Sequence, residues 1–122
     1  MTFAQRREQS RSYLGETVKI GIDRPIGYVH KKPKYDLVYP LNYGYIPNVL
    51  GGDGEELDVY LLGVDVPVER YTAKIIAIVH RRNDEEDKLV AAPEGTTYTA
   101  EEIADRIHFQ EQFYDSEVEA GV

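Results

Sequence analysis

The sequence predicts a mostly antiparallel β-barrel with one helix packed against it. Short segments in which apolar residues alternate with polar ones recur along the chain, and turns rich in Gly, Pro and acidic residues separate them. One stretch with helical spacing of its apolar residues follows near the C-terminus. Because no helix lies between successive strands, the pattern disfavours a doubly wound parallel sheet.

The first part of the chain contains two predicted strands. Residues 1–14 are polar and form either a short helix or a loose N-terminal arm. Residues 17–22 alternate in hydrophobicity and predict a strand. Residues 24–36, which are rich in Pro and basic side chains, predict a loop or an irregular hairpin. Residues 37–46 carry Leu or Tyr at every second position, which predicts a strand in spite of Pro40.

Three more strands follow a turn. The Pro, Asn, Gly and Asp residues of 47–54 are typical of turns. Residues 57–62, 71–80 and 88–92 are apolar and rich in β-branched side chains, so each predicts a strand. With the two earlier strands they make about five, which suits a small closed barrel.

A helix is predicted over residues 99–114. Thr99 and Glu102 form a capping box, in which each side chain accepts a hydrogen bond from the other residue's backbone N–H. Residues 115–122 are acidic and are expected to fray. Length and the lack of a linker predict one domain over residues 1–122.

Composition excludes several classes of site. The chain has no cysteine, so disulfides, thiolate metal sites and cysteine nucleophiles are ruled out. A net charge of −8 argues against general nucleic-acid binding, which needs a basic surface. No apolar stretch reaches the length of a membrane span, and the N-terminus lacks the apolar segment of a signal peptide. A cytoplasmic protein without membrane contact is therefore expected.

The strongest candidate for a site is the acidic segment 52–59, Gly-Asp-Gly-Glu-Glu-Leu-Asp-Val. Carboxylates this close together repel one another, so a fold keeps them either fully solvated or around a cation. Hard divalent cations such as Mg²⁺ prefer oxygen ligands. A second acidic cluster occupies residues 84–87, directly before Lys88; alone, it is more typical of a solvated hairpin tip. Both interpretations remain open at this stage.

Basic and aromatic residues suggest where an anion would bind. Residues 24–34 include three lysines and an arginine but no acid. Tyr43 lies in Asn-Tyr-Gly-Tyr, where its phenol could donate to a phosphate oxygen or could simply pack. His30 and His80 are candidate ligands or bases, although a lone histidine is usually neither. The chain has no phosphate-binding P-loop and no Gly-x-Ser-x-Gly elbow.

Taken together and in order, these segments resemble the soluble family I inorganic pyrophosphatases. The similarity spans roughly residues 18 to 115, and its specificity comes from the order of the motifs. The segments that carry it are Ile-Asp-Arg-Pro at 22–25, Tyr-Pro-Leu-Asn-Tyr-Gly-Tyr-Ile-Pro at 39–47, the acidic segment 52–59, Glu-Asp-Lys-Leu-Val-Ala-Ala-Pro at 86–93 and His-Phe-Gln-Glu at 108–111.

The resemblance implies a five-stranded oligonucleotide-binding-like (OB-like) barrel that hydrolyses pyrophosphate to two phosphates with Mg²⁺, or with Mn²⁺ as an alternative metal. It also implies a homo-oligomer. By similarity, Asp53, Glu55 and Asp58 are catalytic, and Glu55 stands where the family's central aspartate positions and deprotonates the attacking water. Tyr43 and Lys88 would contact phosphate. The implied metal ligands are Asp23, Asp53, Asp58, Asp84 and Asp87.

The chain departs from the family where phosphate is bound. The segment between the first strand and Tyr43 is short and lacks the family's phosphate-binding lysine and arginine. We expect Lys31 and Lys34 to replace them, with the other basic residues of 24–34 as alternatives. Phe113-Tyr114 stand in place of a Tyr-Lys pair. Two alternatives therefore stay open: a hydrolase of another phosphoanhydride, and a non-catalytic barrel that binds metal or anion.

Overall fold

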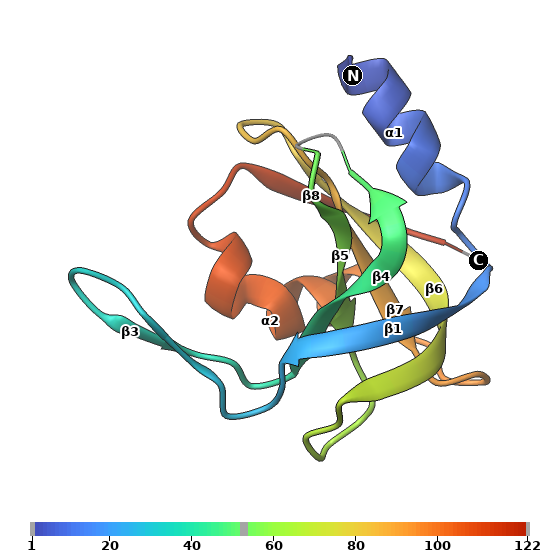
Figure 1. Ribbon diagram of the computed structural model, residues 1–122. Helices are drawn as coiled ribbons and strands as arrows, with labels where there is room; N and C mark the ends of the chain where they lie inside the picture. Colours follow the sequence, from blue (N-terminus) through green and yellow to red (C-terminus); the bar gives the residue numbers. More distant parts are fainter. Residues whose placement is uncertain (1, 52–53, 122) are drawn as a thin grey trace.

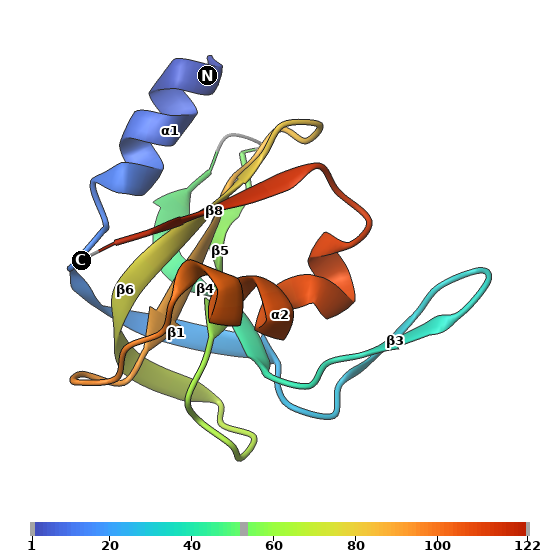
Figure 2. The same ribbon diagram turned by 180° about the vertical axis from the view of Figure 1, so that it is seen from behind.

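The computed structural model describes residues 2–51 and 54–121, which form eight strands and two helices. Figures 1 and 2 show the arrangement from opposite sides. In chain order the elements are α1 (Phe3–Arg11), β1 (Thr17–Arg24), β2 (Val29–Lys31), β3 (Asp36–Val38), β4 (Asn42–Leu50), β5 (Glu56–Leu61), β6 (Arg70–Arg81), β7 (Lys88–Ala92), α2 (Ala100–Glu111) and β8 (Ser116–Ala120).

Five strands close into a barrel. Their order is β1-β4-β5-β7-β6, and β1 pairs with β6 to complete the ring. This confirms the predicted mostly β fold, an OB-like barrel with a C-terminal helix. All these pairings are antiparallel except that of β5 with β7, which is parallel and which the sequence did not predict. Strands β2 and β3 form a separate hairpin that projects from the barrel beside α2 (Figure 1).

Residues 3–11 form a helix, one of the two alternatives expected for residues 1–14. Three local features differ from the sequence-based expectations. The strand predicted over residues 37–46 is divided between β3 and β4, and residues 39–41 belong to neither. The predicted turn at 47–48 is wrong, because β4 continues to Leu50 past an irregularity in its pairing with β5. Residues 116–120 do not fray but form β8, which pairs with β6. The capping box at the start of α2 is confirmed.

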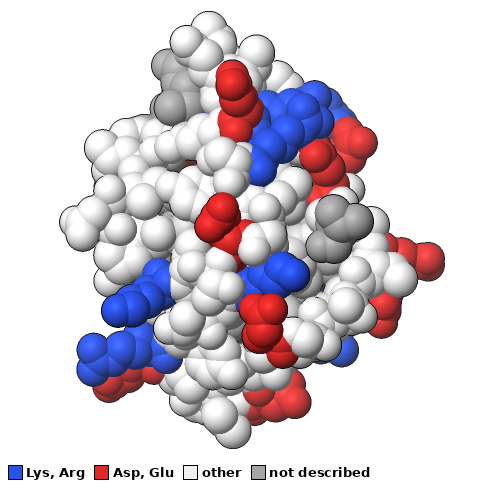
Figure 3. Space-filling view, turned by 90° about the vertical axis from the view of Figure 1, so that its right-hand side faces the viewer, with Lys and Arg blue, Asp and Glu red and all other residues white. Residues whose placement is uncertain are grey.

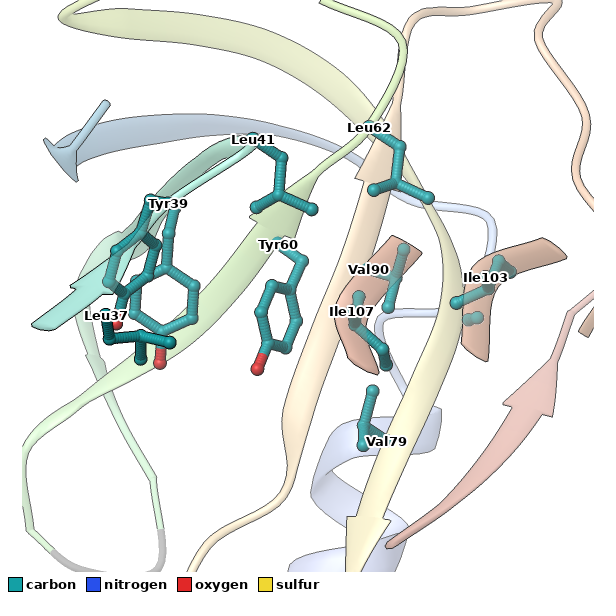
Figure 4. Close-up of a cluster of buried hydrophobic side chains, with 11 residues drawn as sticks. Leu37, Tyr39, Leu41, Tyr60, Leu62, Val79, Val90, Ile103 and Ile107 are labelled. Carbon is teal, nitrogen blue, oxygen red and sulfur yellow. The ribbon is translucent and has the colours of Figure 1, made fainter. Parts of the chain in front are cut away.

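The core has two parts, one on each side of the barrel wall. Inside the barrel, apolar side chains of β1, β5, β6 and β7 pack together. The second cluster lies between the sheet and α2, where Ile103 and Ile107 contact side chains such as Val79 and Val90 (Figure 4). Tyr60 belongs to this cluster and is fully buried, so its hydroxyl needs a polar partner. These contacts fix the C-terminal end of α2 beside the barrel.

Gly44 lets β1 and β4 approach closely. A Cβ atom at this position would lie 1.8 Å from the carbonyl oxygen of Gly21. Gly44→Ala is therefore expected to force the strands apart and to lower the free energy of unfolding by about 1–3 kcal/mol. Urea unfolding would measure this. Gly95→Ala is the comparison for backbone strain alone, because Gly95 has a positive φ but open space around it. A cost of Gly44→Ala below about 1 kcal/mol would contradict the close-approach argument.

The surface carries charges of both signs. On the face shown in Figure 3, acidic and basic side chains are interspersed rather than gathered into one basic patch. In the described part of the chain, no helix is long and apolar enough to cross a membrane.

Candidate active site

A cavity of about 430 Å³ lies between the β2–β3 hairpin, one end of the barrel and the C-terminal end of α2. Its wall combines acidic, basic and aromatic side chains. Such a mixture suits an anionic ligand accompanied by cations. The lining residues are Asp23, Arg24, His30, Lys32, Tyr35, Leu37, Tyr43, Asp58, Lys88, Gln110, Phe113 and Tyr114.

Three predicted site residues meet at this cavity. Asp58 of β5 accepts hydrogen bonds at Oδ2 from Tyr43 Oη at 2.8 Å and from Lys88 Nζ at 2.7 Å. Burial raises the pKa of Tyr43 well above its usual value, and the Asp58 carboxylate adds to the shift. The phenol therefore stays protonated and acts as a donor. Neighbouring strands of the barrel hold the cluster, because β4 pairs with β5 and β5 pairs with β7.

Glu86 joins this cluster, and the sequence analysis did not single it out. Lys88 Nζ contacts Glu86 as well as Asp58, and both Glu86 and Lys88 are buried. Side chains in an extended segment alternate between its two sides, so positions 86 and 88 share one side. This period of two is the signal that could have identified Glu86 once Lys88 was placed at the site.

Asp87 lies on the other side of the same segment. It is 1% exposed, and its Oδ1 is 3.2 Å from Arg6 Nε while its Oδ2 is 3.0 Å from His80 Nδ1. Asp84 also lies outside the cavity lining, and its Oδ2 accepts from Arg81 at 2.9 Å. The structure therefore does not bring these two predicted metal ligands to Asp58.

The other predicted residues divide into those at the cavity and those beyond it. Asp23 lines the rim; loss of solvent raises the pKa of its carboxyl, and Asp58 raises it further. Lys31 points away and pairs with Asp36 at 3.0 Å, and Lys34 is exposed outside the lining. Glu55 is exposed, and Asp53 lies outside the described residues.

Arg24 takes the place expected for the hairpin lysines. Its guanidinium donates to Tyr39 Oη at 2.5 Å while its side chain lines the cavity. Tyr39 in turn donates to Gln110, and Gln110 donates to Tyr60 Oη at 2.8 Å. Tyr60 then donates to Glu111 at 2.5 Å. This chain of buried polar groups holds the Arg24 side chain at the cavity wall, and its members Gln110 and Tyr60 were missed by the sequence analysis.

Two aromatic rings lie at the mouth of the cavity. Tyr35 of the hairpin stacks on Phe113, just beyond α2, with a centroid separation of 5.3 Å and an interplanar angle of 19°. Their exposed fractions are 41% and 48%. The contact joins the projecting hairpin to the end of α2, so the hairpin bounds the cavity instead of swinging free.

A histidine on β6 gives the fold a pH dependence. Hydrogen bonds to Asp87 and then Glu119 raise the pKa of His80 above its usual 6.5. Its stabilising effect is therefore complete below pH 6.5 and is lost as the pH rises through the raised value. Hydrogen bonds from Arg11 and then His80 lower the pKa of Glu119 from 4.5 to about 2, so that effect is lost as the pH falls below 4.5.

We therefore expect the difference in melting temperature between wild type and His80→Gln to be largest between pH 4.5 and 6.5. Thermal unfolding across pH 3–9 would measure it. His108→Gln is the control, because His108 is exposed on α2. A constant difference over the whole range would contradict a charged His80.

Comparisons with known proteins bear on the family and the fold of the chain. The family model of inorganic pyrophosphatase matches residues 13–118. The chain belongs to the inorganic pyrophosphatase family. An inorganic pyrophosphatase from Ehrlichia chaffeensis superposes with a TM-score of 0.64 at 17% identity, and the alignment covers 88% of each chain. At this identity the structural likeness establishes the fold.

Curated members of the pyrophosphatase family match over shorter stretches. The chain is 42% identical over 65 residues to the inorganic pyrophosphatase of Saccharolobus solfataricus, which covers 50% of this chain and 38% of that protein. It is 35% identical over 83 residues to soluble inorganic pyrophosphatase 2 of Chlamydomonas reinhardtii, which covers 63% of this chain and 43% of that protein. The aligned region thus spans about two-fifths of these relatives.

Proposed function

We propose that this chain hydrolyses inorganic pyrophosphate to two phosphates with Mg²⁺. The observation that carries the proposal is the cluster of Asp58, Tyr43 and Lys88 in the cavity of a pyrophosphatase-family barrel. Phosphoryl transfer depends mainly on positioning and on neutralising charge. A cavity that presents carboxylates for metal beside donors for phosphate meets both requirements.

The donor set fits a hard divalent cation. Within the described part of the chain, no three His, Asp or Glu side chains converge as a metal cage. However, Asp58 and Glu86 share the Lys88 ammonium, so two carboxylates already hold one cation between them. Mg²⁺ usually uses one or two carboxylates, with waters and substrate phosphates at the other positions. We assign the metal to Asp58 and Glu86, with Asp53 and Asp23 as further ligands, and Mn²⁺ as the alternative ion.

The chain's own residues would then bind and orient the substrate. The bound metal would neutralise phosphate charge and acidify a water molecule. Lys88 and Arg24 supply positive charge for phosphate oxygens, and the protonated Tyr43 supplies a neutral donor. Glu55 is proposed to accept the proton of the attacking water, by its place in the acidic motif. Asp84 and Asp87 are left out of this set, because their oxygens are engaged elsewhere.

The test is phosphate release from pyrophosphate over a range of Mg²⁺ concentrations. We expect two phosphates per pyrophosphate and complete loss of turnover with EDTA. Circular dichroism would show that the protein remains folded in EDTA. If folded protein releases no phosphate with either Mg²⁺ or Mn²⁺, the proposal fails. Calorimetric binding of pyrophosphate without turnover would then support the non-catalytic alternative.

The aromatic mouth favours one second candidate, hydrolysis of an organic diphosphate. Tyr35 and Phe113 place exposed ring surface at the edge of a cavity that carries the anion-binding groups. An aromatic group attached to a diphosphate could stack there. Parallel assays with a nucleoside diphosphate would separate the candidates. A higher kcat/KM for the nucleoside diphosphate than for pyrophosphate would favour the second.

Two expectations about the context of the chain stay predictions. Self-association rests on the resemblance to the family, and light scattering would measure the mass in solution. The cytoplasmic location rests on the absence of cysteine from this sequence. Localisation of the tagged protein in its own cells would test it.

A further inference from the structure

The N-terminal helix α1 lies outside the residues that the family model matches, yet it contacts the segment that leads into the site. Only residues 13–118 match the family, whereas α1 covers Phe3–Arg11. The residues that α1 buries are polar, namely Arg6 and Ser10. A helix of this length is marginal by itself, so its contacts with the barrel must hold it in place. Those contacts are concentrated at the acidic turn between β6 and β7.

Arg6 holds both ends of this turn. Its guanidinium donates to the carbonyl of Arg81 at 2.7 Å and to the carbonyl of Asp84 at 2.5 Å. Its Nε lies 3.2 Å from Asp87 Oδ1, and both side chains are almost completely buried. Ser10, one turn further along α1, lies 3.4 Å from the other oxygen of Asp87. A buried guanidinium needs such partners, because an unpaired charge in the interior is costly.

The side on which Asp87 is held determines where its neighbours point. Adjacent side chains of an extended segment face opposite sides. Because Asp87 faces α1, its neighbours Glu86 and Lys88 face Asp58. If the segment rotated about its own axis so that Asp87 faced the cavity, Glu86 and Lys88 would turn away from the cavity. The Arg6–Asp87 pair thus fixes which of the acidic residues can serve the site.

We infer that Arg6 is a positioning residue: through Asp87 and the turn carbonyls, α1 holds Glu86 and Lys88 in the geometry that binds metal and phosphate. This inference rests on the proposed function for the role of Glu86 and Lys88. It assigns to α1 a part in the site although the helix contributes no cavity-lining residue.

The test compares Arg6→Gln with Arg11→Gln. Both variants remove one positive charge from α1, but Arg11 hydrogen-bonds Glu119 of β8 and acts on Asp87 only through a longer-range charge interaction. Mn²⁺ affinity measured by calorimetry without substrate is the first readout, and kcat and KM at several Mg²⁺ concentrations are the second. Loss of such a supporting partner typically weakens metal binding by about 10–100-fold.

For Arg6→Gln we expect a loss of that size in Mn²⁺ affinity, and a kcat that recovers as Mg²⁺ is raised. Arg11→Gln should stay close to wild type in both. Arg6→Lys, which keeps the charge beside Asp87, should fold even if Arg6→Gln does not, and should show a smaller loss of affinity. Thermal unfolding of each variant identifies the temperature at which all are folded.

The outcomes separate this inference from the proposed function. If wild type hydrolyses pyrophosphate while folded Arg6→Gln and Arg11→Gln bind Mn²⁺ equally well, the role of Arg6 is refuted and the proposed function stands. If wild type hydrolyses nothing, the proposed function fails, and the Mn²⁺ titrations still decide whether Arg6 supports the metal ligands. A kcat of folded Arg6→Gln that does not recover as Mg²⁺ is raised would also refute it.

Discussion

Asp58→Asn is expected to lower kcat for pyrophosphate hydrolysis by about 10²–10³-fold, the size typical of losing one electrostatic group at a reacting centre. Asn preserves the shape of the side chain but removes the charge that Tyr43 and Lys88 both contact. It also removes a proposed metal ligand. Phosphate release at saturating pyrophosphate would measure the loss.

The matched control for this variant is Asp65→Asn. Asp65 is an exposed aspartate in the loop after β5, so the control makes the same change of charge away from the cavity. Its kcat should equal that of wild type. A folded Asp58→Asn protein that keeps more than about a tenth of wild-type activity would contradict the role of Asp58, since one lost ligand interaction already costs more.

Glu111→Gln is expected to lower the free energy of unfolding by about 1.5–3 kcal/mol, because it weakens the charged hydrogen bonds of the buried Arg81–Glu111 pair and leaves Asp84 as the acidic partner of Arg81. Glu111 accepts from Arg81 at Nε, 3.0 Å away, and at a second guanidinium nitrogen, 2.5 Å away. It also accepts from Tyr60. Urea unfolding at neutral pH would measure the change as a lower midpoint.

The pH dependence gives this prediction a second readout. Burial alone would raise the pKa of Glu111, but the hydrogen bonds from Arg81 lower it below its usual 4.5. The pair therefore stabilises the fold above pH 4.5, and the effect is lost as the pH falls through the lowered value. The free energies of unfolding of wild type and Glu111→Gln should therefore become similar at acid pH. Glu101→Gln, an exposed change on the same helix, should cost less than about 1 kcal/mol.

Strands of the barrel could be predicted from the pattern of apolar residues, because apolar side chains occupy the buried face of a strand. Alternation of apolar residues located β1, and short apolar runs located β5, β6 and β7 closely. The pattern could not locate β8, whose Ser-Glu-Val-Glu-Ala sequence has a single large apolar residue and which depends on pairing with β6. Nor could it place Pro47 within β4. The strand accommodates this proline because its pairing with β5 is interrupted between Tyr45 and Leu50, where a missing N–H does no harm.

Site residues could be predicted where a side chain with a suitable functional group lies within a predicted strand. Asp58, Tyr43 and Lys88 carry functional groups at fixed points of strands, and the structure brings them together. The choice between Glu86 and Asp87 depends on which side of the segment faces the cavity, and a contact from distant Arg6 settles that. The sequence could not show that Arg24, and not a hairpin lysine, lines the cavity. The direction of the Arg24 side chain depends on its hydrogen bond to Tyr39.

Closure of the barrel leaves β8 as an open margin of the sheet, hydrogen-bonded to β6 and without a strand on its other side in the described part of the chain. Unpaired strand margins can recruit strands of other molecules and begin aggregation. Here the strand is short and carries two glutamates. Glu117 pairs with Arg82, the residue after β6, and Glu119 pairs with Arg11 of α1. Colloidal solubility should therefore depend on these two glutamates, because charged side chains on an open strand discourage the addition of a strand from another molecule.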